Sequence, residues 1–183
     1  GGMGGPPQPE PVRTDVPFIQ CAACKAMVKR SHFVVSKQTK KQTEEDILSQ
    51  LKNVCDSSSA DGEWLHLYDM VEQGRAIELK KMPAAGVCGV ECITVALACS
   101  MALGEVDDLL AEELYKGKKS AKELALELCD TSCPSPAPLT PEDRPAGEPF
   151  TPKPKPMPEE VKVAEPKKRK KKGKKSKKPK AEL

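Results

Sequence analysis

Residues 21–24 read Cys-Ala-Ala-Cys and residues 129–133 read Cys-Asp-Thr-Ser-Cys, so two cysteines stand near each end of the central part of the chain. The four cysteines between them are Cys55, Cys88, Cys92 and Cys99. The total of eight is even, and the 50 residues that follow the last cysteine contain none. Such spacing is typical of a domain that disulfides hold together in an oxidising compartment.

The composition indicates one small folded domain between two segments without regular structure. Residues 18–133 carry helical patterning and are long enough for a single domain. Residues 1–17 are rich in Gly and Pro, and residues 134–183 are rich in Pro and Lys, so we expect both to be disordered. Because the chain has only 1 Trp, 2 Tyr and 3 Phe, its core must be aliphatic, and so thin a core benefits from disulfides.

The net charge of +3 hides a strong asymmetry along the chain. Residues 151–183 contain 14 Lys and Arg against 4 Glu, whereas the rest contains 16 basic and 23 acidic residues. An acidic domain therefore precedes a basic tail, and the two need not share a partner. No apolar run is long enough to span a membrane and no leader peptide is visible, so we expect a mature protein of the endoplasmic reticulum lumen or a secreted one.

Apolar periodicity predicts a mainly α-helical bundle of about five helices with one β-hairpin. The expected helices cover residues 18–40, 43–55, 88–103, 107–117 and 120–129. Residues 64–79 lean towards strand alternation, which favours a hairpin there, although a short helix over 64–71 is the alternative.

Caps and breaks define the expected helix ends. Thr43, followed by three acidic residues, resembles an N-cap, and residues 120–123 have the form of a capping box. Gly104 is expected to end the third helix. The acidic pairs at 107–108 and 112–113 are then interpreted as first-turn and solvent-face acids.

The spacing of the cysteines suggests how they pair. Cysteines one helical turn apart have Cβ atoms about 5–6 Å apart, whereas a disulfide needs roughly 3.5–4.5 Å. The two terminal pairs can instead face each other from the first and last helices, and Cys88 can join Cys92 if it lies in the turn before its helix. Other pairings are possible, so the scheme is a hypothesis. The expected pairs are Cys21–Cys133, Cys24–Cys129, Cys55–Cys99 and Cys88–Cys92.

Four stretches surround the six cysteines that are expected to form disulfides between distant parts of the chain, and their sequences are similar to those of a known domain family. They are Phe18-Ile19-Gln20-Cys21-Ala22-Ala23-Cys24, Asn53-Val54-Cys55, Ala98-Cys99 and Leu128-Cys129-Asp130-Thr131-Ser132-Cys133. Together they resemble a saposin B-type domain. With the 64–79 insert, residues 87–92 and the Lys-rich tail, they are more narrowly similar to the canopy-type and plant saposin-B-like proteins of the secretory pathway. The resemblance implies a small helical fold whose first and last helices are joined by disulfides.

Two features depart from these families. Ordinary saposins have six cysteines and a shorter connection between the third and the fourth, so the chain does not match a plain lipid-extracting saposin. Canopy-type proteins usually end in a retrieval signal for the endoplasmic reticulum. Residues 180–183 read Lys-Ala-Glu-Leu and lack the acid of that signal, so we expect retrieval to be weak or absent.

Redox chemistry and metal binding by the cysteines and histidines are less favoured than structural roles. Cys21 and Cys24 match a redox Cys-x-x-Cys motif, and zinc can bind such a pair together with a second cysteine pair. The chain lacks a βαβ pattern, and partner cysteines stand elsewhere, so structural disulfides are favoured. His32 and His66 lie outside any metal or nucleophile motif. We therefore expect no catalytic residue, no metal site, no cofactor and no enzymatic activity.

The strongest electrostatic feature is a basic run near the end of the sequence. It comprises Lys167, Lys168, Arg169, Lys170, Lys171, Lys172, Lys174, Lys175, Lys177 and Lys178. Anionic lipids and acidic proteins are possible partners of this run. Nucleic acid is disfavoured because no aromatic residue is interleaved to stack on bases. A disordered solubilising tail is the simplest interpretation.

These observations favour a non-enzymatic binding protein of the secretory pathway, a chaperone-like adaptor for client proteins. The alternative is a protein that binds lipids or anionic membrane surfaces through the saposin-like domain and the basic tail. A third hypothesis is a reduced nuclear protein that binds zinc or nucleic acid. Intact mass with and without reduction separates the third from the other two, because only the first two require oxidised cysteines.

Deleting residues 166–180 should leave the melting temperature of the domain nearly unchanged, because so charged a segment buries little apolar surface. The deletion should also remove salt-sensitive binding to anionic vesicles. Circular dichroism during heating checks the first expectation, and vesicle cosedimentation checks the second. A large fall in melting temperature would mean that the tail docks on the acidic domain.

Overall fold

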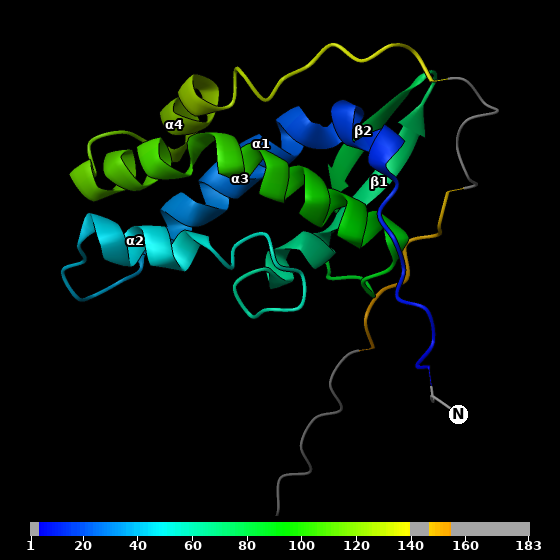
Figure 1. The fold of residues 1–183 in the computed structure, drawn as a ribbon, viewed down its shortest axis with the longest axis horizontal. Helices are drawn as coiled ribbons and strands as arrows, with labels where there is room; N and C mark the ends of the chain where they lie inside the picture. Colours follow the sequence, from blue (N-terminus) through cyan, green and yellow to red (C-terminus); the bar gives the residue numbers. More distant parts are fainter. Residues whose placement is uncertain (1–3, 140–146, 155–183) are drawn as a thin grey trace, which may run out of the picture. The chain divides into compact units, whose positions relative to one another are not determined.

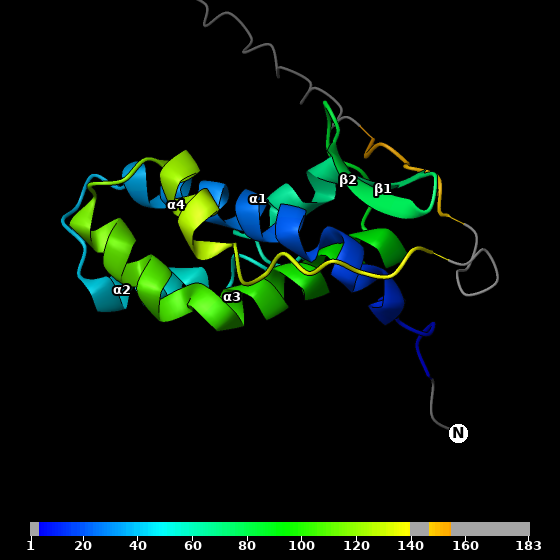
Figure 2. The same cartoon turned by 90° about the horizontal axis from the view of Figure 1, so that it is seen from above.

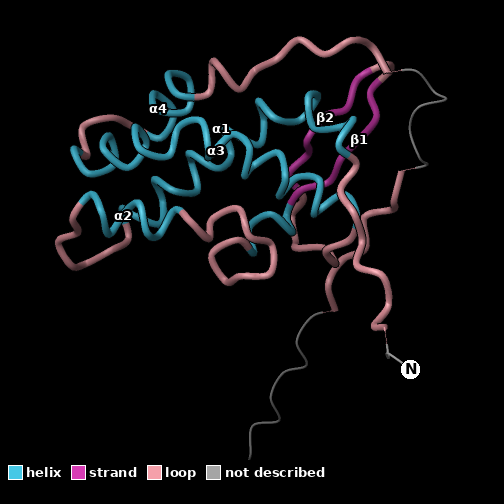
Figure 3. Tube along the Cα trace, in the orientation of Figure 1, coloured by secondary structure: helices cyan, strands magenta, loops and turns pink. Residues whose placement is uncertain are grey.

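The computed structural model describes residues 4–139 and 147–154. Its helices and strands are α1 (Val16–Ser36), α2 (Glu44–Leu51), β1 (Tyr68–Gln73), β2 (Ala76–Lys81), α3 (Val90–Lys116) and α4 (Ala121–Leu128), with 3₁₀ helices at Arg13–Asp15 and Glu63–Leu67. α1 and α3 lie side by side, and the hairpin packs against them at one end of the bundle (Figures 1 and 3). Seen from above, α4 lies against α1 and α2 against α3 (Figure 2). A mainly helical fold with a hairpin insert is thereby confirmed.

The core forms where α1 packs on α3. α1 buries side chains four residues apart, from Ile19 through Ala23 and Met27 to Ser31. Residues spaced by four lie on one face of a helix, so this stripe turns a continuous surface towards α3. Ile19, Ala23 and Met27 are fully buried, and burying a side chain of the size of Ile or Met is worth about 1.5–3 kcal/mol.

The structure contains four α-helices within the described residues rather than the expected five, because α3 runs through Gly104 without a break. Its buried stripe continues from Ala102 to Val106 and Leu110 at helical spacing. A glycine inside a helix costs about 0.5–1 kcal/mol, which the burial of these neighbours outweighs. The helix ends instead at Gly117, whose positive φ of 62° caps it as sequence patterning predicted for this region.

Other helix ends were predicted with mixed success. The capping boxes at Thr43 and Ser120 are present, each with its side chain accepting a hydrogen bond from the third helical residue. α1 begins two residues earlier than expected, with Pro17 in its first turn, and ends at Ser36 rather than near residue 40. α2 ends at Leu51, so the expected continuation to residue 55 is wrong.

The insert forms an antiparallel hairpin preceded by one 3₁₀ helix. β1 pairs with β2 from Tyr68 opposite Lys81 to Gln73 opposite Ala76. Gly74 has a positive φ of 62° at the first position of the two-residue turn, where such turns favour glycine. The alternative prediction, a helix over 64–71, is confirmed only in its first part, where Glu63–Leu67 form a 3₁₀ helix.

The eight cysteines form four disulfides and none is free. The pairs are Cys21–Cys133, Cys24–Cys129, Cys55–Cys99 and Cys88–Cys92, as the spacing predicts. The first two join α1 to the end of α4, and the third joins the segment after α2 to α3. Such bonds indicate an oxidising environment. In the described part of the chain, no helix combines the length and apolarity that crossing a bilayer requires.

Replacing Cys24 by Ala should lower the free energy of unfolding by about 2–5 kcal/mol, because the bond closes a long loop in the unfolded chain. Denaturant titration gives this value, and thiol labelling should find Cys129 reactive. The matched control is Cys88→Ala, which opens a bond across a separation of 4 residues rather than 105 and should cost less. Equal losses, or a peptide map joining Cys21 to Cys24, would contradict the argument.

Candidate functional site

The exposed face of α1 carries cations around one aromatic ring. Lys29, Phe33 and Lys37 stand four residues apart, so they share a face of the helix. That face lies opposite the stripe that packs on α3. Because α1 also contacts β2, the hairpin brings Lys81 to the same surface. The α1–hairpin groove, of about 370 Å³, is lined by Ala26, Lys29, Arg30, Phe33, Trp64, Leu67, Tyr68 and Lys81.

The floor of the α1–hairpin groove is held rigidly. Trp64 is almost fully buried, and its indole nitrogen donates a hydrogen bond of 2.7 Å to the Val54 carbonyl. Its ring meets Tyr68 edge to face, with centroids 5.7 Å apart. Burial raises the pKa of Tyr68, so its phenol stays protonated at physiological pH. The aromatic floor is therefore neutral and fixed in place.

The rim of the groove is cationic and open to a ligand. Phe33 is 50% exposed, with the Arg30 guanidinium 5.6 Å and the Lys37 ammonium 5.3 Å from its ring centroid. Arg30 is partly exposed as a residue, although its Nε atom is buried and therefore closed to a ligand from outside. In that same part of the chain, the ion pairs belong to Lys116 and Lys119, not to the rim. The rim can therefore take an anionic group from outside.

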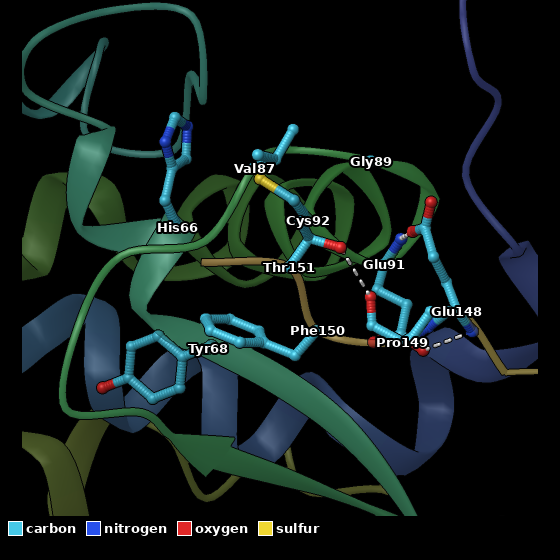
Figure 4. A pocket seen from close by; sticks show the side chains of 10 residues that line it. All are labelled: His66, Tyr68, Val87, Gly89, Glu91, Cys92, Glu148, Pro149, Phe150 and Thr151. Atoms are coloured by element: carbon cyan, nitrogen blue, oxygen red, sulfur yellow. Dashed lines mark hydrogen bonds between the residues drawn. The ribbon is translucent and has the colours of Figure 1, made fainter. Parts of the chain in front are cut away.

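A second polar cluster lies where residues 147–153 meet the domain, beyond the boundary expected at Cys133. Val87 donates its backbone N–H to the Thr151 carbonyl at 2.7 Å, and Lys153 donates to Ala85 at 2.9 Å. Gly86 lies under Phe150, where an added Cβ would be 2.6 Å from the ring. Part of the segment that was expected to be unstructured thus contacts the domain closely (Figure 4).

Glu91 links three parts of the fold at this junction. From the first turn of α3, its carboxylate accepts the Met70 N–H of β1 and the Glu148 N–H, each at 3.2 Å. Figure 4 shows Glu91 and Glu148 side by side, with the bond from the Glu148 N–H to the Glu91 carboxylate. Burial first, and then the neighbouring carboxyl of Asp69, raise the pKa of Glu91 to about 7.

The predicted site residues have different outcomes. The cysteines pair as expected, whereas the basic run 167–178 lies outside the described residues. Glu113 was expected on the solvent face, which is wrong: its side chain is largely buried and bonded to Lys116 and Lys119 at 2.9 and 3.0 Å. The groove was missed, although the spacing of Lys29, Phe33 and Lys37 in the sequence was a signal for it.

No protein-family model, curated protein or solved structure matches the chain. The geometry of the chain itself therefore carries the functional argument.

Substituting Glu91 by Gln should flatten the dependence of stability on pH. A carboxyl whose pKa is raised by folding stabilises the protein fully below its unfolded pKa of 4.5 and loses that contribution as the pH rises through about 7. Wild-type protein should therefore lose stability between these values, and Glu91→Gln should lose less. Melting temperatures across this range test the expectation, with the exposed Glu78→Gln as control. Identical slopes in all three proteins would contradict it.

Proposed function

We propose that this chain is a non-enzymatic binding protein of the secretory pathway, a chaperone-like adaptor that holds an acidic segment of its client proteins in the α1–hairpin groove. The observation that supports this most is a cationic rim above a neutral aromatic floor, on a domain that is otherwise acidic. A client segment with carboxylates beside a leucine or an aromatic residue matches both parts.

The chemistry of the groove supports a reversible contact. Arg30 is partly exposed and forms no ion pair within the described residues, and a guanidinium can pair with a carboxylate through two parallel hydrogen bonds. Lys29 and Lys81 add point charges, and exposed pairs of this kind are worth at most about 1 kcal/mol each. The half-exposed ring of Phe33 gains apolar contact when it is covered. Because each of these contacts is weak, their total binding free energy allows a client to be released as well as captured.

The disulfides support the part of this proposal that assigns the protein to the secretory pathway. Four of them indicate an oxidising environment, which the endoplasmic reticulum lumen and the extracellular space both provide. The saposin-type resemblance of the cysteine stretches is consistent with a secretory-pathway adaptor and remains part of the proposal.

Binding to an anionic membrane surface is the second candidate, because Phe33 flanked by Arg30 and Lys37 also fits the headgroup layer. Enclosure of a whole lipid between α1 and α2 is disfavoured. The apolar hollow between α1 and α2, lined in part by Val34, Val35, Leu51 and Val54, holds only about 110 Å³. Ligand pockets are usually about 300–1,000 Å³.

Trp64 gives a direct readout of the groove, since it is the only tryptophan of the chain. We expect an acidic peptide containing Glu and Leu to change the Trp64 fluorescence of the full-length protein in a saturable and salt-sensitive way. Reversing two rim charges, Arg30→Glu with Lys81→Glu, should weaken this binding at least about tenfold, the equivalent of about 1.4 kcal/mol.

The control for that experiment is Lys122→Glu, which reverses an exposed charge at the start of α4, outside the groove. It should bind the peptide as the wild type does. Vesicles containing phosphatidylserine test the second candidate. A fluorescence response to vesicles but not to peptide would replace the adaptor by a membrane-surface protein. Peptide binding that the rim variants leave unchanged would contradict the groove as the site.

A further inference from the structure

Three potential zinc ligands meet beside the start of α3. A ring nitrogen of His66 and the sulfur atoms of Cys88 and Cys92 all lie within 4.8 Å of one another. Figure 4 shows His66 and Cys92 lining the same hollow. Histidine nitrogen and cysteine sulfur are the donors that zinc prefers in proteins. In the oxidised protein, however, the two sulfur atoms are bonded to each other.

The backbone brings these residues together from two separate elements. His66 lies in the 3₁₀ helix Glu63–Leu67, and its carbonyl accepts the N–H of Gly86 at 2.7 Å. That bond holds the chain two residues before Cys88. Gly89 then caps α3, so Cys88 precedes the helix and Cys92 lies in its first turn. The three side chains are thus placed by the fold and do not depend on the disulfide between the two cysteines.

The imidazole of His66 has one nitrogen available for a cation. Nε2 lies 2.8 Å from the Ser57 carbonyl, and because a carbonyl oxygen only accepts, Nε2 carries the proton. In the neutral imidazole Nδ1 then holds the lone pair, and this atom is buried without a hydrogen-bond partner in the described structure. A backbone carbonyl on one nitrogen with a free lone pair on the other is the usual arrangement of a histidine that binds metal.

Of the four disulfides, Cys88–Cys92 is the one that can open with the least effect on the fold. It spans 4 residues, whereas the others span 44 or more and join separate elements. Cys88 is partly exposed, as are Cys21 and Cys133, so a reductant can reach it, while Cys24, Cys99 and Cys129 are fully buried. The Cys21–Cys133 bond closes a loop across a separation of 112 residues, and this loop makes its opening more costly to the fold. Opening this bond leaves the three long-range disulfides in place.

We propose that His66, Cys88 and Cys92 form a zinc site that is closed in the oxidised protein and opened by reduction. A dithiol reductant gives two electrons and two protons to the Cys88–Cys92 bond and itself becomes a disulfide. Zn²⁺ then displaces the two thiol protons to solvent and binds both thiolates and Nδ1 of His66. Three protein ligands leave the fourth tetrahedral position to water or to a ligand from a partner.

The dimensions of the cluster suit this ion. Zn–S bonds of about 2.3 Å and Zn–N bonds of about 2.0–2.1 Å place the donors of a tetrahedral site somewhat less than 4 Å apart. One ring nitrogen of His66 and the two sulfur atoms already lie within 4.8 Å of one another, so rotation of the side chains can bring Nδ1 and the sulfur atoms to these distances. Two thiolates balance the charge of the ion, and the site is neutral.

The test uses the full-length protein, reduced mildly by a phosphine, which opens disulfides without adding a competing thiol. Alkylation and peptide mapping should find Cys88 and Cys92 free before any other cysteine. The reduced protein should then bind one Zn²⁺ per chain in competition with a chromophoric chelator, and the oxidised protein none. Co²⁺ should give the thiolate charge-transfer bands of a tetrahedral site, a readout that non-specific binding does not produce.

Matched variants decide whether His66 is a ligand. His66→Gln keeps a donor for the Ser57 carbonyl but removes the free lone pair, and it should weaken zinc binding at least tenfold. His32→Gln, at the only other histidine, should bind as the wild type does. Cys88→Ser with Cys92→Ser should keep the fold and bind no zinc. Reduction of another disulfide first, no zinc uptake after reduction, or equal affinity in His66→Gln would each overturn the proposal.

Discussion

The two disulfides that join α1 to the end of α4 constrain everything else in this domain. Cys21–Cys133 and Cys24–Cys129 lie one helical turn apart on α1, so together they restrict both the distance and the rotation of that helix. Because the core contains few aromatic side chains, aliphatic packing alone stabilises the position of α1 in the bundle only weakly. Covalent attachment at one end of α1 fixes which of its faces is buried and which is open.

That division of α1 connects stability to function. The stripe through Ile19 and Met27 packs on α3, and the opposite face presents Lys29 and Phe33 to solvent beside the hairpin. The hairpin contributes a floor that Trp64 anchors through its bond to Val54. The groove is therefore a by-product of how the helix is held, and its cations stand out on a domain with an excess of acidic residues.

The features that could be predicted from the sequence depend on residues close together in the chain or on the geometric limits of disulfide pairing. Capping boxes involve residues three positions apart, and the cysteine pairs follow from which helices can face each other, so both were predicted from the chain alone. The prediction that a helix ends at Gly104 was wrong. A glycine indicates a helix end only where the pattern of buried residues at helical spacing stops, and here it continues past Gly104. The raised pKa of Glu91 and the enclosure of the groove depend on contacts between distant segments, and the spacing of Lys29, Phe33 and Lys37 indicates only the α1 side of the groove.

The contact of Phe150 with Gly86 changes where the functional polypeptide ends. Residues 147–153 return to the domain after the last cysteine and cover Gly86, a position with no room for a side chain. A protease that trimmed the chain just after Cys133 would leave every disulfide intact, yet it would uncover the hollow that His66, Tyr68 and Cys92 line. The smallest unit that keeps this surface closed therefore extends to residue 153, twenty residues past the point where the covalent cross-links stop.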